Sequence, residues 1–196
     1  MTVSVILAAG ASQRMGKPKA LLEINNTTFL QHIIHTYRQS RVEKIIVVLG
    51  SHAREIENML SGMEVTVTLN DNYRAGQLSS ILAGINAAEN FHADAALLHP
   101  VDHPLVSVDV IHSLLDGFEN STQMIVLPVF KGKRGHPVLF SRKLFEELKN
   151  APPEIRARSL VWSHQNSVLE IETKEPGVII DIDTPEDYAR LRQNTH

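Results

Sequence analysis

The 196-residue sequence contains no cysteine. That absence excludes disulfides, a thiol nucleophile and any cysteine-ligated metal site. The net charge is also small, −3 with the histidines neutral, so the composition does not favour nonspecific binding to nucleic acid. No apolar run approaches the length of a membrane span, and the N-terminal residues lack the basic region of a signal peptide. We therefore expect a cytoplasmic protein that acts neither on nucleic acid nor in a membrane.

Two familiar phosphate-binding motifs are missing as well. A Walker loop has four residues between its glycines and a Ser or Thr after its lysine, whereas five residues separate Gly10 from Gly16 and no hydroxyl residue follows Lys17. The dinucleotide fingerprint G-x-G-x-x-G is absent, because Ser12 stands where its second glycine belongs. These absences disfavour a P-loop enzyme and a nicotinamide-dependent oxidoreductase.

The N-terminal part instead contains an apolar run, residues 3–7, followed by a loop of small residues, 8–12. Small side chains allow the backbone to approach a ligand closely and to turn its N–H groups toward an anion. Arg14, Lys17 and Lys19 add fixed positive charge to the same loop. A strand that leads into such a loop predicts a phosphate-binding site, with an ordinary charged surface turn as the alternative.

Short apolar runs and helical periodicities alternate along the chain. The predicted strands span residues 3–7, 44–50, 65–69, 95–99, 124–130, 168–171 and 178–182. The predicted helices span residues 29–37, 52–60, 79–88, 108–118, 144–148, 155–164 and 185–193. Because several strands lack a polar face, we expect a mostly parallel sheet with helices on both sides, a Rossmann-like three-layer α/β architecture. No linker or repeat interrupts the pattern, so residues 1–196 are expected to form one domain.

Ligands of parallel sheets bind beyond the carboxyl ends of the strands, and Asp102 follows one of the predicted strands. It stands between Pro100 and Pro104, and a carboxylate held in this way suits Mg²⁺, which prefers oxygen ligands together with substrate phosphates. Asp is also common in ordinary turns. His99 and His103 flank Asp102 and raise a zinc site as a further alternative, although their spacing matches no recognised closed site.

A second acidic element contains Asp181 and Asp183. In a strand these two carboxylates would share a face, where they repel each other unless a cation or hydrogen-bond donors lie between them. From these residues alone, a bound cation and capping of the following helix by Asp183 are both open interpretations. Thr184 is a plausible N-cap of that helix.

Two further loops are candidates for ligand contacts. Gly76, Ser79 and Ser80 lie where a loop enters the helix predicted from Ser79 or Ser80, and helix N-termini favour negatively charged ligands. Helix capping by Ser79 is the plainer interpretation. Residues 131–137 form a basic turn that contains Lys131, Lys133 and Arg134. A solvated hairpin is the alternative there.

Taken together and in this order, the motifs resemble those of the nucleotidyltransferases that make molybdenum cofactor dinucleotides, the MobA-like family. The stretch L-A-A-G-A-S-Q-R-M-G-K-P-K, residues 7–19, is similar to the family's signature loop, which wraps a nucleoside triphosphate. V-D-H-P, residues 101–104, resembles its Asp-x-Pro metal element. D-I-D-T-P-E-D, residues 181–187, resembles its closing element, and R-G-H-P, residues 134–137, resembles its acceptor-side turn.

The resemblance implies a nucleotide-diphospho-sugar transferase-like fold and a role for each matching residue. Nucleotide binding is implied for Leu7, Ala8, Ala9, Gly10, Arg14, Lys19, Gly76, Ser79 and Ser80. Acceptor binding is implied for His103, Arg134, Gly135 and His136. Arg14, Lys19 and Asp102 would be the catalytic residues, and Asp102 and Asp183 would hold Mg²⁺.

The Ala-Ala-Gly form of the loop resembles the cytidylyltransferase branch of the family. It implies transfer of CMP from CTP to molybdopterin, with release of pyrophosphate and later delivery to a molybdoenzyme. His103 stands where the family is expected to have Gln or Met, which keeps a sugar phosphate, an alditol phosphate or another small phosphate open as the acceptor. A non-catalytic chaperone that binds the cofactor for molybdoenzyme maturation is the alternative from a different functional class.

Overall fold

The computed structural model describes residues 1–152 and 157–194. The main sheet contains β1 (Thr2–Ala8), β4 (Lys44–Leu49), β5 (Thr66–Leu69), β6 (Ala95–Pro100), β7 (Ile125–Phe130), β8 (Lys133–Arg134), β9 (Val138–Ser141) and β10 (Val168–Glu172). A separate pair consists of β2 (Glu23–Ile24) and β3 (Thr27–Thr28). The helices are α1 (Phe29–Arg38), α2 (Ala53–Met59), α3 (Gln77–Asn90), α4 (Val108–Glu119), α5 (Phe145–Lys149), α6 (Ala157–Ser163) and α7 (Pro185–Asn194). None of the helices in the described part of the chain is long and apolar enough to cross a membrane.

The main sheet has the strand order β10-β7-β9-β6-β1-β4-β5, with β8 paired to β7. The pairs β6-β1, β1-β4, β4-β5 and β7-β10 are parallel, whereas β9 runs antiparallel to both of its neighbours. The predicted mostly parallel sheet is therefore confirmed. The antiparallel β9 joins the half of the sheet around β1 to the half around β7.

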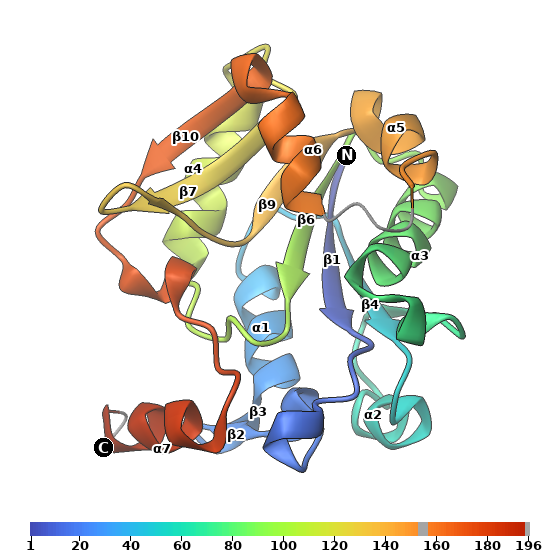
Figure 1. The fold of residues 1–196 in the computed structure, drawn as a ribbon, viewed down its shortest axis with the longest axis vertical. Coiled ribbons are helices and arrows are strands. Elements are labelled where there is room, and N and C mark those ends of the chain that lie inside the picture. Colours follow the sequence, from blue (N-terminus) through green and yellow to red (C-terminus); the bar gives the residue numbers. More distant parts are fainter. Residues whose placement is uncertain (153–156, 195–196) are drawn as a thin grey trace.

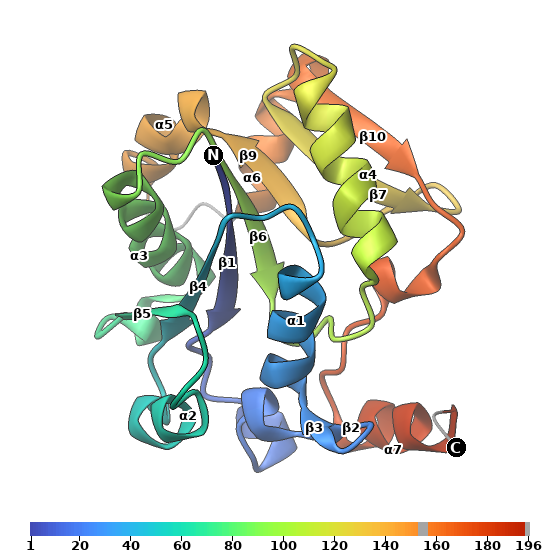
Figure 2. The ribbon, with the colours of Figure 1, turned by 180° about the vertical axis from the view of Figure 1, so that it is seen from behind.

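Alternate side chains of the strands enter two separate cores, because successive residues of a strand point to opposite faces. Val3, Val5 and Leu7 of β1 pack on the face covered by α3 and α5, whereas Ile6 and Ala8 pack on the face covered by α1 and α4. The two faces are seen in Figures 1 and 2. Because both faces of the sheet are buried, the sequences of these strands are continuous apolar runs without alternating polar residues.

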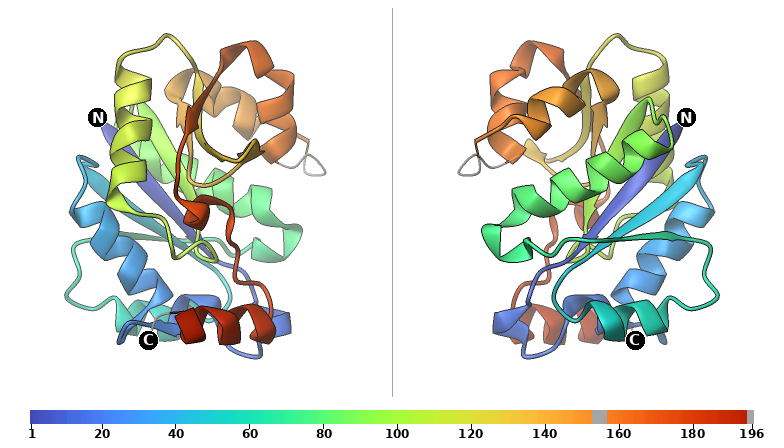
Figure 3. Two further views of the ribbon diagram at one scale, coloured as in Figure 1. Left: turned by 90° about the vertical axis from the view of Figure 1, so that its left-hand side faces the viewer. Right: turned by 90° about the vertical axis from the view of Figure 1, so that its right-hand side faces the viewer.

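The carboxyl ends of β1, β4, β5 and β6 point in one direction and lead into loops at one end of the molecule. There α2 and α7 flank the loops, as the side views show (Figure 3). Although α7 follows the last strand, it lies beside β2, because the hydroxyl of Tyr188 bonds the backbone of Glu23. This arrangement brings the C-terminal segment to the end of the sheet where the first loop lies.

The prediction of a strand over residues 178–182 is wrong. Pro176–Ile179 forms a 3-10 helix, and the segment that follows it is irregular. Val178 and Ile182 are buried, so their apolar character reflects packing against the core and not pairing in the sheet. The backbone groups of this segment bond loop residues one at a time: the Val178 carbonyl accepts from His136 N–H, and Ile182 N–H donates to the Asp102 carbonyl.

The helix expected to begin at Ser79 or Ser80 begins earlier. It starts at Gln77, and its N-cap is Gly76, whose φ of 105° favours glycine. The Ser79 hydroxyl turns back to the carbonyls of Gly76 and Asn72, so capping by Ser79 is not observed. A helix was also predicted over residues 155–164. Residues 155 and 156 of this prediction lie outside the described residues, and α6 is the helix described within the rest of the range.

Candidate functional site

The small-residue loop leaves β1 at Ala8 and folds back on itself. Ser12 has a left-handed backbone, φ 49°, and its hydroxyl accepts the N–H of Lys19 at 3.0 Å. The residues between them form a turn, with short 3-10 segments at Gln13–Met15 and Lys19–Leu21. The hydrogen bond therefore holds the loop in a closed curve at the end of the sheet.

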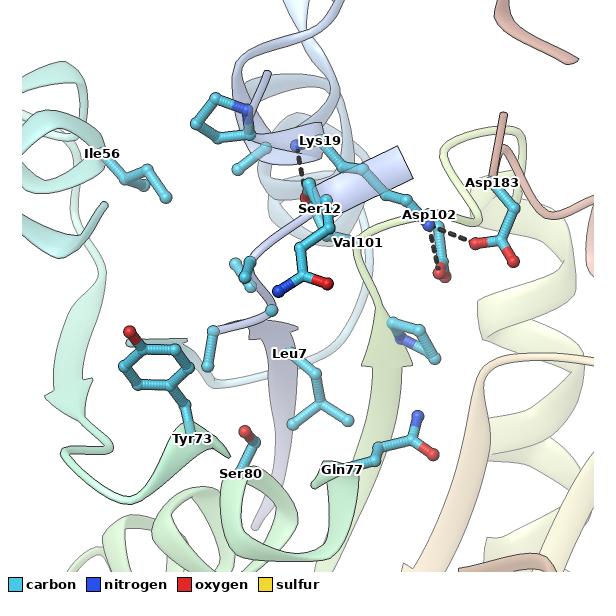
Figure 4. A pocket seen from close by; sticks show the side chains of 18 of the residues that line it. Leu7, Ser12, Lys19, Ile56, Tyr73, Gln77, Ser80, Val101, Asp102 and Asp183 are labelled. Atoms are coloured by element: carbon cyan, nitrogen blue, oxygen red, sulfur yellow. Dashed lines mark hydrogen bonds and ion pairs between the residues drawn. The ribbon is translucent and has the colours of Figure 1, made fainter. Parts of the chain in front are cut away.

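A cavity of about 630 Å³ lies inside this curve (Figure 4). Its lining includes these residues predicted to bind nucleotide: Leu7, Ala8, Ala9, Gly10, Arg14, Lys19, Gly76 and Ser80. It also includes Asp102 and Asp183. Ser79 was predicted with this group but is not part of the lining. The volume is that of a site for a ligand of nucleotide size.

The wall opposite the loop comes from Ile56 of α2, the loop that follows β5 and the start of α3. Gly50, directly after β4, leaves room for Tyr73, because a Cβ at position 50 would lie 2.7 Å from the Tyr73 Cβ. Buried Asn70, directly after β5, donates from its amide nitrogen to the hydroxyls of Ser79 at 2.9 Å and Ser80 at 3.0 Å. These contacts fix Tyr73 and Ser80 in the wall.

At the mouth of the cavity, two carboxylates converge on one ammonium group. The Lys19 Nζ lies 3.1 Å from Oδ2 of Asp102 and also forms an ion pair with Oδ1 of Asp183. Arg14 lies 2.6 Å from the other oxygen of Asp183. The Lys19 side chain is only 12% exposed, so this contact is less screened by solvent than an ordinary surface ion pair.

A backbone hydrogen bond explains why Asp183 lies beside Asp102. The N–H of Ile182 donates to the carbonyl of Asp102 at 2.9 Å, which places the next residue next to the Asp102 turn. Beyond it, Thr184 and Asp187 cap α7 reciprocally: the Asp187 N–H donates to the Thr184 hydroxyl, and the Thr184 N–H donates to the Asp187 carboxylate. Thr184 therefore caps α7, as predicted, and the side chain of Asp183 is free of that role and contacts Lys19.

The charges of the acidic pair follow from these contacts. Burial by itself would raise the pKa of Asp102, but the hydrogen bond from His103 and the nearby Lys19 hold it well below its usual range. The hydrogen bond from Lys19 also lowers the pKa of Asp183, and Arg14 adds to this effect. Both carboxylates are therefore ionised at neutral pH.

This donor set fits a hard divalent cation. Two ionised carboxylates already face a single positive group, and oxygen ligands are those that Mg²⁺ and Mn²⁺ prefer. No cluster of three or more potential metal ligands exists among the described residues. A cation bound here would therefore complete its coordination with substrate phosphates and water, as Mg²⁺ commonly does.

The alternative of a zinc site at His99 and His103 is not supported. The two ring nitrogens of His99 are engaged by the Tyr37 hydroxyl at 3.0 Å and by the His103 carbonyl at 2.9 Å. The Nδ1 of His103 lies 2.9 Å from Oδ1 of Asp102. Because a carboxylate only accepts hydrogen bonds, this nitrogen carries the proton, and only Nε2 of His103 is left with a lone pair. Among the described residues no group of three potential ligands surrounds it, so the pair does not form a closed zinc site.

A second cavity, of about 520 Å³, lies on the sheet face covered by α3, where α6 also contributes to its lining. Its walls are mostly apolar and include Leu127, Phe140 and Trp162. Arg134, Gly135 and His136, which were predicted to bind the acceptor, all belong to this lining. Leu7, Gln77 and Pro100 line both cavities. The two cavities are thus neighbours that share one wall.

The remaining predicted acceptor residue, His103, lies outside both cavities. Its ring is bonded to Asp102 and packs edge-on against His136, with centroids 4.6 Å apart. Of the three cations of the basic turn, only Arg134 lines the second cavity, and its charge is paired with Glu170 at 2.7 Å. Lys131 instead lies over the ring of Phe130.

Buried histidines make the fold sensitive to acid. Burial lowers the pKa of His99 to about 4, so the unfolded chain, with a pKa of about 6.5, binds the proton more readily. The free energy of unfolding should therefore fall as the pH drops below 6.5, and His99 alone should account for about 3 kcal/mol at pH 4. Urea denaturation across this range, on the wild type and His99→Gln, measures the contribution. An equally steep loss in His99→Gln would contradict it.

Among the residues that line the nucleotide-sized cavity and were not assigned a role from the sequence are Tyr73 and Gln77. Both belong to the loop that was identified for its glycine and serines. The signal that could have identified Gln77 is its place directly after Gly76, at the first turn of a helix whose N-terminus faces a predicted ligand. Tyr73 carried no comparable signal, because its position depends on the space left by Gly50.

Comparison with known proteins agrees with this geometry. The family described as "MobA-like NTP transferase domain" matches residues 4–168. The molybdenum cofactor cytidylyltransferase of Escherichia coli is 28% identical over 96% of this chain and 94% of its own. A nucleotidyl transferase from Methanothermobacter thermautotroptrophicus superposes with a TM-score of 0.84 at 25% identity, covering 100% of this chain and 97% of that one.

A third relative has a metal bound. Rv0371C from Mycobacterium tuberculosis, solved in complex with manganese, has a TM-score of 0.80 at 26% identity, with 98% of each chain covered. The fold, with its mixed sheet flanked by helices, is that of the nucleotide-diphospho-sugar transferases. The chain belongs to the MobA-like NTP transferase family of nucleotidyltransferases.

Proposed function

We propose that the protein transfers CMP from CTP to molybdopterin and releases pyrophosphate. The observation that carries the proposal is the convergence of Asp102 and Asp183 on Lys19 at the mouth of the cavity enclosed by the small-residue loop. A carboxylate pair at this place suits metal-assisted phosphoryl chemistry. The neighbouring second cavity offers a place for the acceptor.

In this proposal the triphosphate lies along the loop of residues 8–12. Backbone N–H groups in a loop of small residues bind phosphate oxygens well, and Arg14 and Lys19 add charge-assisted hydrogen bonds. The base would lie toward Tyr73 and Ser80, which form the opposite wall. The preference for CTP rests on the second alanine of the Ala-Ala-Gly stretch and on the similarity to a cytidylyltransferase.

The reaction joins an acceptor phosphate to the nucleotide. An oxygen of that phosphate attacks the α-phosphorus of CTP, a new P–O bond forms, and the bond from the α-phosphorus to the bridging oxygen breaks as pyrophosphate leaves. Mg²⁺ held by Asp102 and Asp183 would neutralise the charge on the phosphate oxygens. The acceptor phosphate is already ionised, so the main tasks of Arg14 and Lys19 are positioning and stabilisation of negative charge.

The second cavity suits an acceptor that has a flat ring. Burial lowers the pKa of His136 to about 3, so its imidazole is neutral, and among the described residues its Nδ1 has no hydrogen-bond partner. Arg134 and the apolar walls complete the cavity, and the shared wall would lead the acceptor phosphate to the nucleotide.

Trp162 provides a direct test of acceptor binding. It is the one tryptophan of the sequence, it lines the second cavity, and it is 58% exposed. A stable pterin phosphate should quench its fluorescence in a saturable way, and Trp162→Ala should raise the KM for the acceptor about tenfold through lost ring contact. Trp162→Phe serves as the control that keeps a ring. Unchanged fluorescence at saturating acceptor would count against this placement.

A thermal-shift panel tests the nucleotide part of the proposal. CTP, GTP, ATP and UTP are compared with Mg²⁺ present and absent, since a ligand at a hundredfold excess over its Kd stabilises the folded state by about 2.7 kcal/mol. We expect selective, Mg²⁺-dependent stabilisation by CTP. Selective stabilisation by GTP would instead assign a guanylyltransferase, and binding without turnover of any acceptor would favour the chaperone alternative. A cytoplasmic location and delivery to a molybdoenzyme belong to the same proposal.

A further inference from the structure

A buried histidine lies behind the acidic pair and has no part in the reaction as proposed. His99 is in β6, three residues before Asp102, and is 1% exposed. Its ring packs edge-on against Tyr37 of α1, with centroids 5.5 Å apart. Because burial lowers the pKa of His99 to about 4, the ring is neutral at neutral pH. A buried neutral imidazole has one N–H and one acceptor nitrogen to satisfy.

The hydrogen bonds of His99 define its tautomer. Its Nε2 lies 2.9 Å from the His103 carbonyl, and a carbonyl only accepts, so Nε2 carries the proton. Its Nδ1 is then an acceptor, and the Tyr37 hydroxyl, 3.0 Å away, donates to it. The chain of hydrogen bonds thus runs in one direction, from Tyr37 through the His99 ring to the His103 carbonyl.

The carbonyl at the end of this chain belongs to the turn that presents Asp102. In the same turn the N–H of His103 donates to the Pro100 carbonyl, and the His103 ring donates to Oδ1 of Asp102. The His103 residue therefore contacts the carboxylate with its side chain while His99 holds its backbone. A shift of this backbone would move the ring and the carboxylate together.

We propose that His99 and Tyr37 are positioning residues that orient the carboxylate of Asp102 through the backbone of His103. The inference rests on the proposed function in one respect, the binding of a divalent cation by Asp102. It also connects α1 to the site. Tyr37 of α1 lines neither cavity, but its hydroxyl selects the His99 tautomer whose N–H bonds the backbone of the Asp102 turn. Second-sphere groups of this kind commonly change metal affinity by about 10–100-fold.

The test measures Mn²⁺ affinity directly, by electron paramagnetic resonance of the free ion, in the protein without nucleotide. Tyr37→Phe should weaken Mn²⁺ binding about tenfold and raise the metal concentration required for half-maximal activity, with the KM for CTP at saturating metal unchanged. Ile33→Val, a buried substitution on the same helix, is the control for general loosening of α1 and should leave Mn²⁺ affinity unchanged. Equal Mn²⁺ affinity in Tyr37→Phe and the wild type, or an equal loss in Ile33→Val, would overturn the inference.

Two histidine variants and one aspartate variant separate the possible failures. His99→Gln retains an amide N–H that can reach the His103 carbonyl and should keep Mn²⁺ affinity closer to the wild type than His99→Leu, which retains none. The reverse order would overturn the inference. Asp102→Asn should abolish Mn²⁺ binding at this site. If it binds Mn²⁺ as the wild type does, the proposed metal site itself fails; if it loses binding while Tyr37→Phe keeps it, only the positioning role fails.

Discussion

Asp102→Asn should lower kcat/KM about a thousandfold, which corresponds to about 4 kcal/mol of transition-state stabilisation. The asparagine has nearly the same shape, so the turn and its hydrogen bond from His103 can persist. The substituted side chain has no charge to hold a divalent cation, and its amide nitrogen would face the ammonium of Lys19 as a second donor. The loss should therefore fall on the metal-dependent step, measured as steady-state release of pyrophosphate over a range of Mg²⁺ concentrations.

The control is Asp181→Asn, which removes one carboxylate from the C-terminal segment that contains Asp183. Asp181 lies in a different cavity, next to α7, and is exposed. The net charge changes equally in the two variants, so a general electrostatic effect would lower both activities. We expect Asp181→Asn to retain wild-type activity. Near-normal turnover in Asp102→Asn would rule out the proposed role of this carboxylate.

Lys19→Met should change the affinities for triphosphate and for metal in opposite directions. Without the ammonium group, the triphosphate loses a charge-assisted hydrogen bond of about 1.5–3 kcal/mol, so CTP should bind about 10–100-fold more weakly. Asp102 and Asp183 lose the cation that now lies between them, and their repulsion then favours an external cation. Mn²⁺ alone should therefore bind more tightly than to the wild type.

Calorimetric titration of CTP and magnetic resonance titration of Mn²⁺ measure the two effects separately. Lys17→Met is the matched control, because Lys17 belongs to the same loop but is exposed and does not line the cavity. It should change neither affinity by more than a small factor. If Lys19→Met weakened both ligands, Lys19 would be a general support for the loop and not a cation placed between two carboxylates.

The parts of the molecule that could be predicted from the sequence depend on local pattern. The strand before the small-residue loop is confirmed because its apolar residues are buried on both faces. Asp102 was found because a carboxylate after a buried strand lies at the edge of the sheet where ligands bind. The assignment of all residues to one domain, and the roles of the individual site residues, stay predictions.

The parts that could not be predicted depend on contacts between distant segments. The strand predicted at residues 178–182 is wrong because β-branched side chains can bury themselves without pairing in a sheet, as Val178 and Ile182 do. Asp183 lies beside Asp102 because of a backbone bond from Ile182 and not because of a shared strand face, and its role as a metal ligand stays a prediction. The ring of His103 bonds Asp102 and packs against His136 of the second cavity, contacts that no local pattern indicates, and the role of His103 at the acceptor stays a prediction.

The wall shared by the two cavities limits how substrate preference can change independently. Leu7, Gln77 and Pro100 line both spaces, so a substitution there would alter two affinities at once and would seldom improve both. Leu127 and Phe140 line only the second space. Directed evolution toward a new acceptor should therefore first accumulate substitutions at positions that line only the second cavity, such as Leu127 and Phe140. Variants with a substitution in the shared wall should need a second, compensating substitution in the loop of residues 8–12 to restore nucleotide affinity.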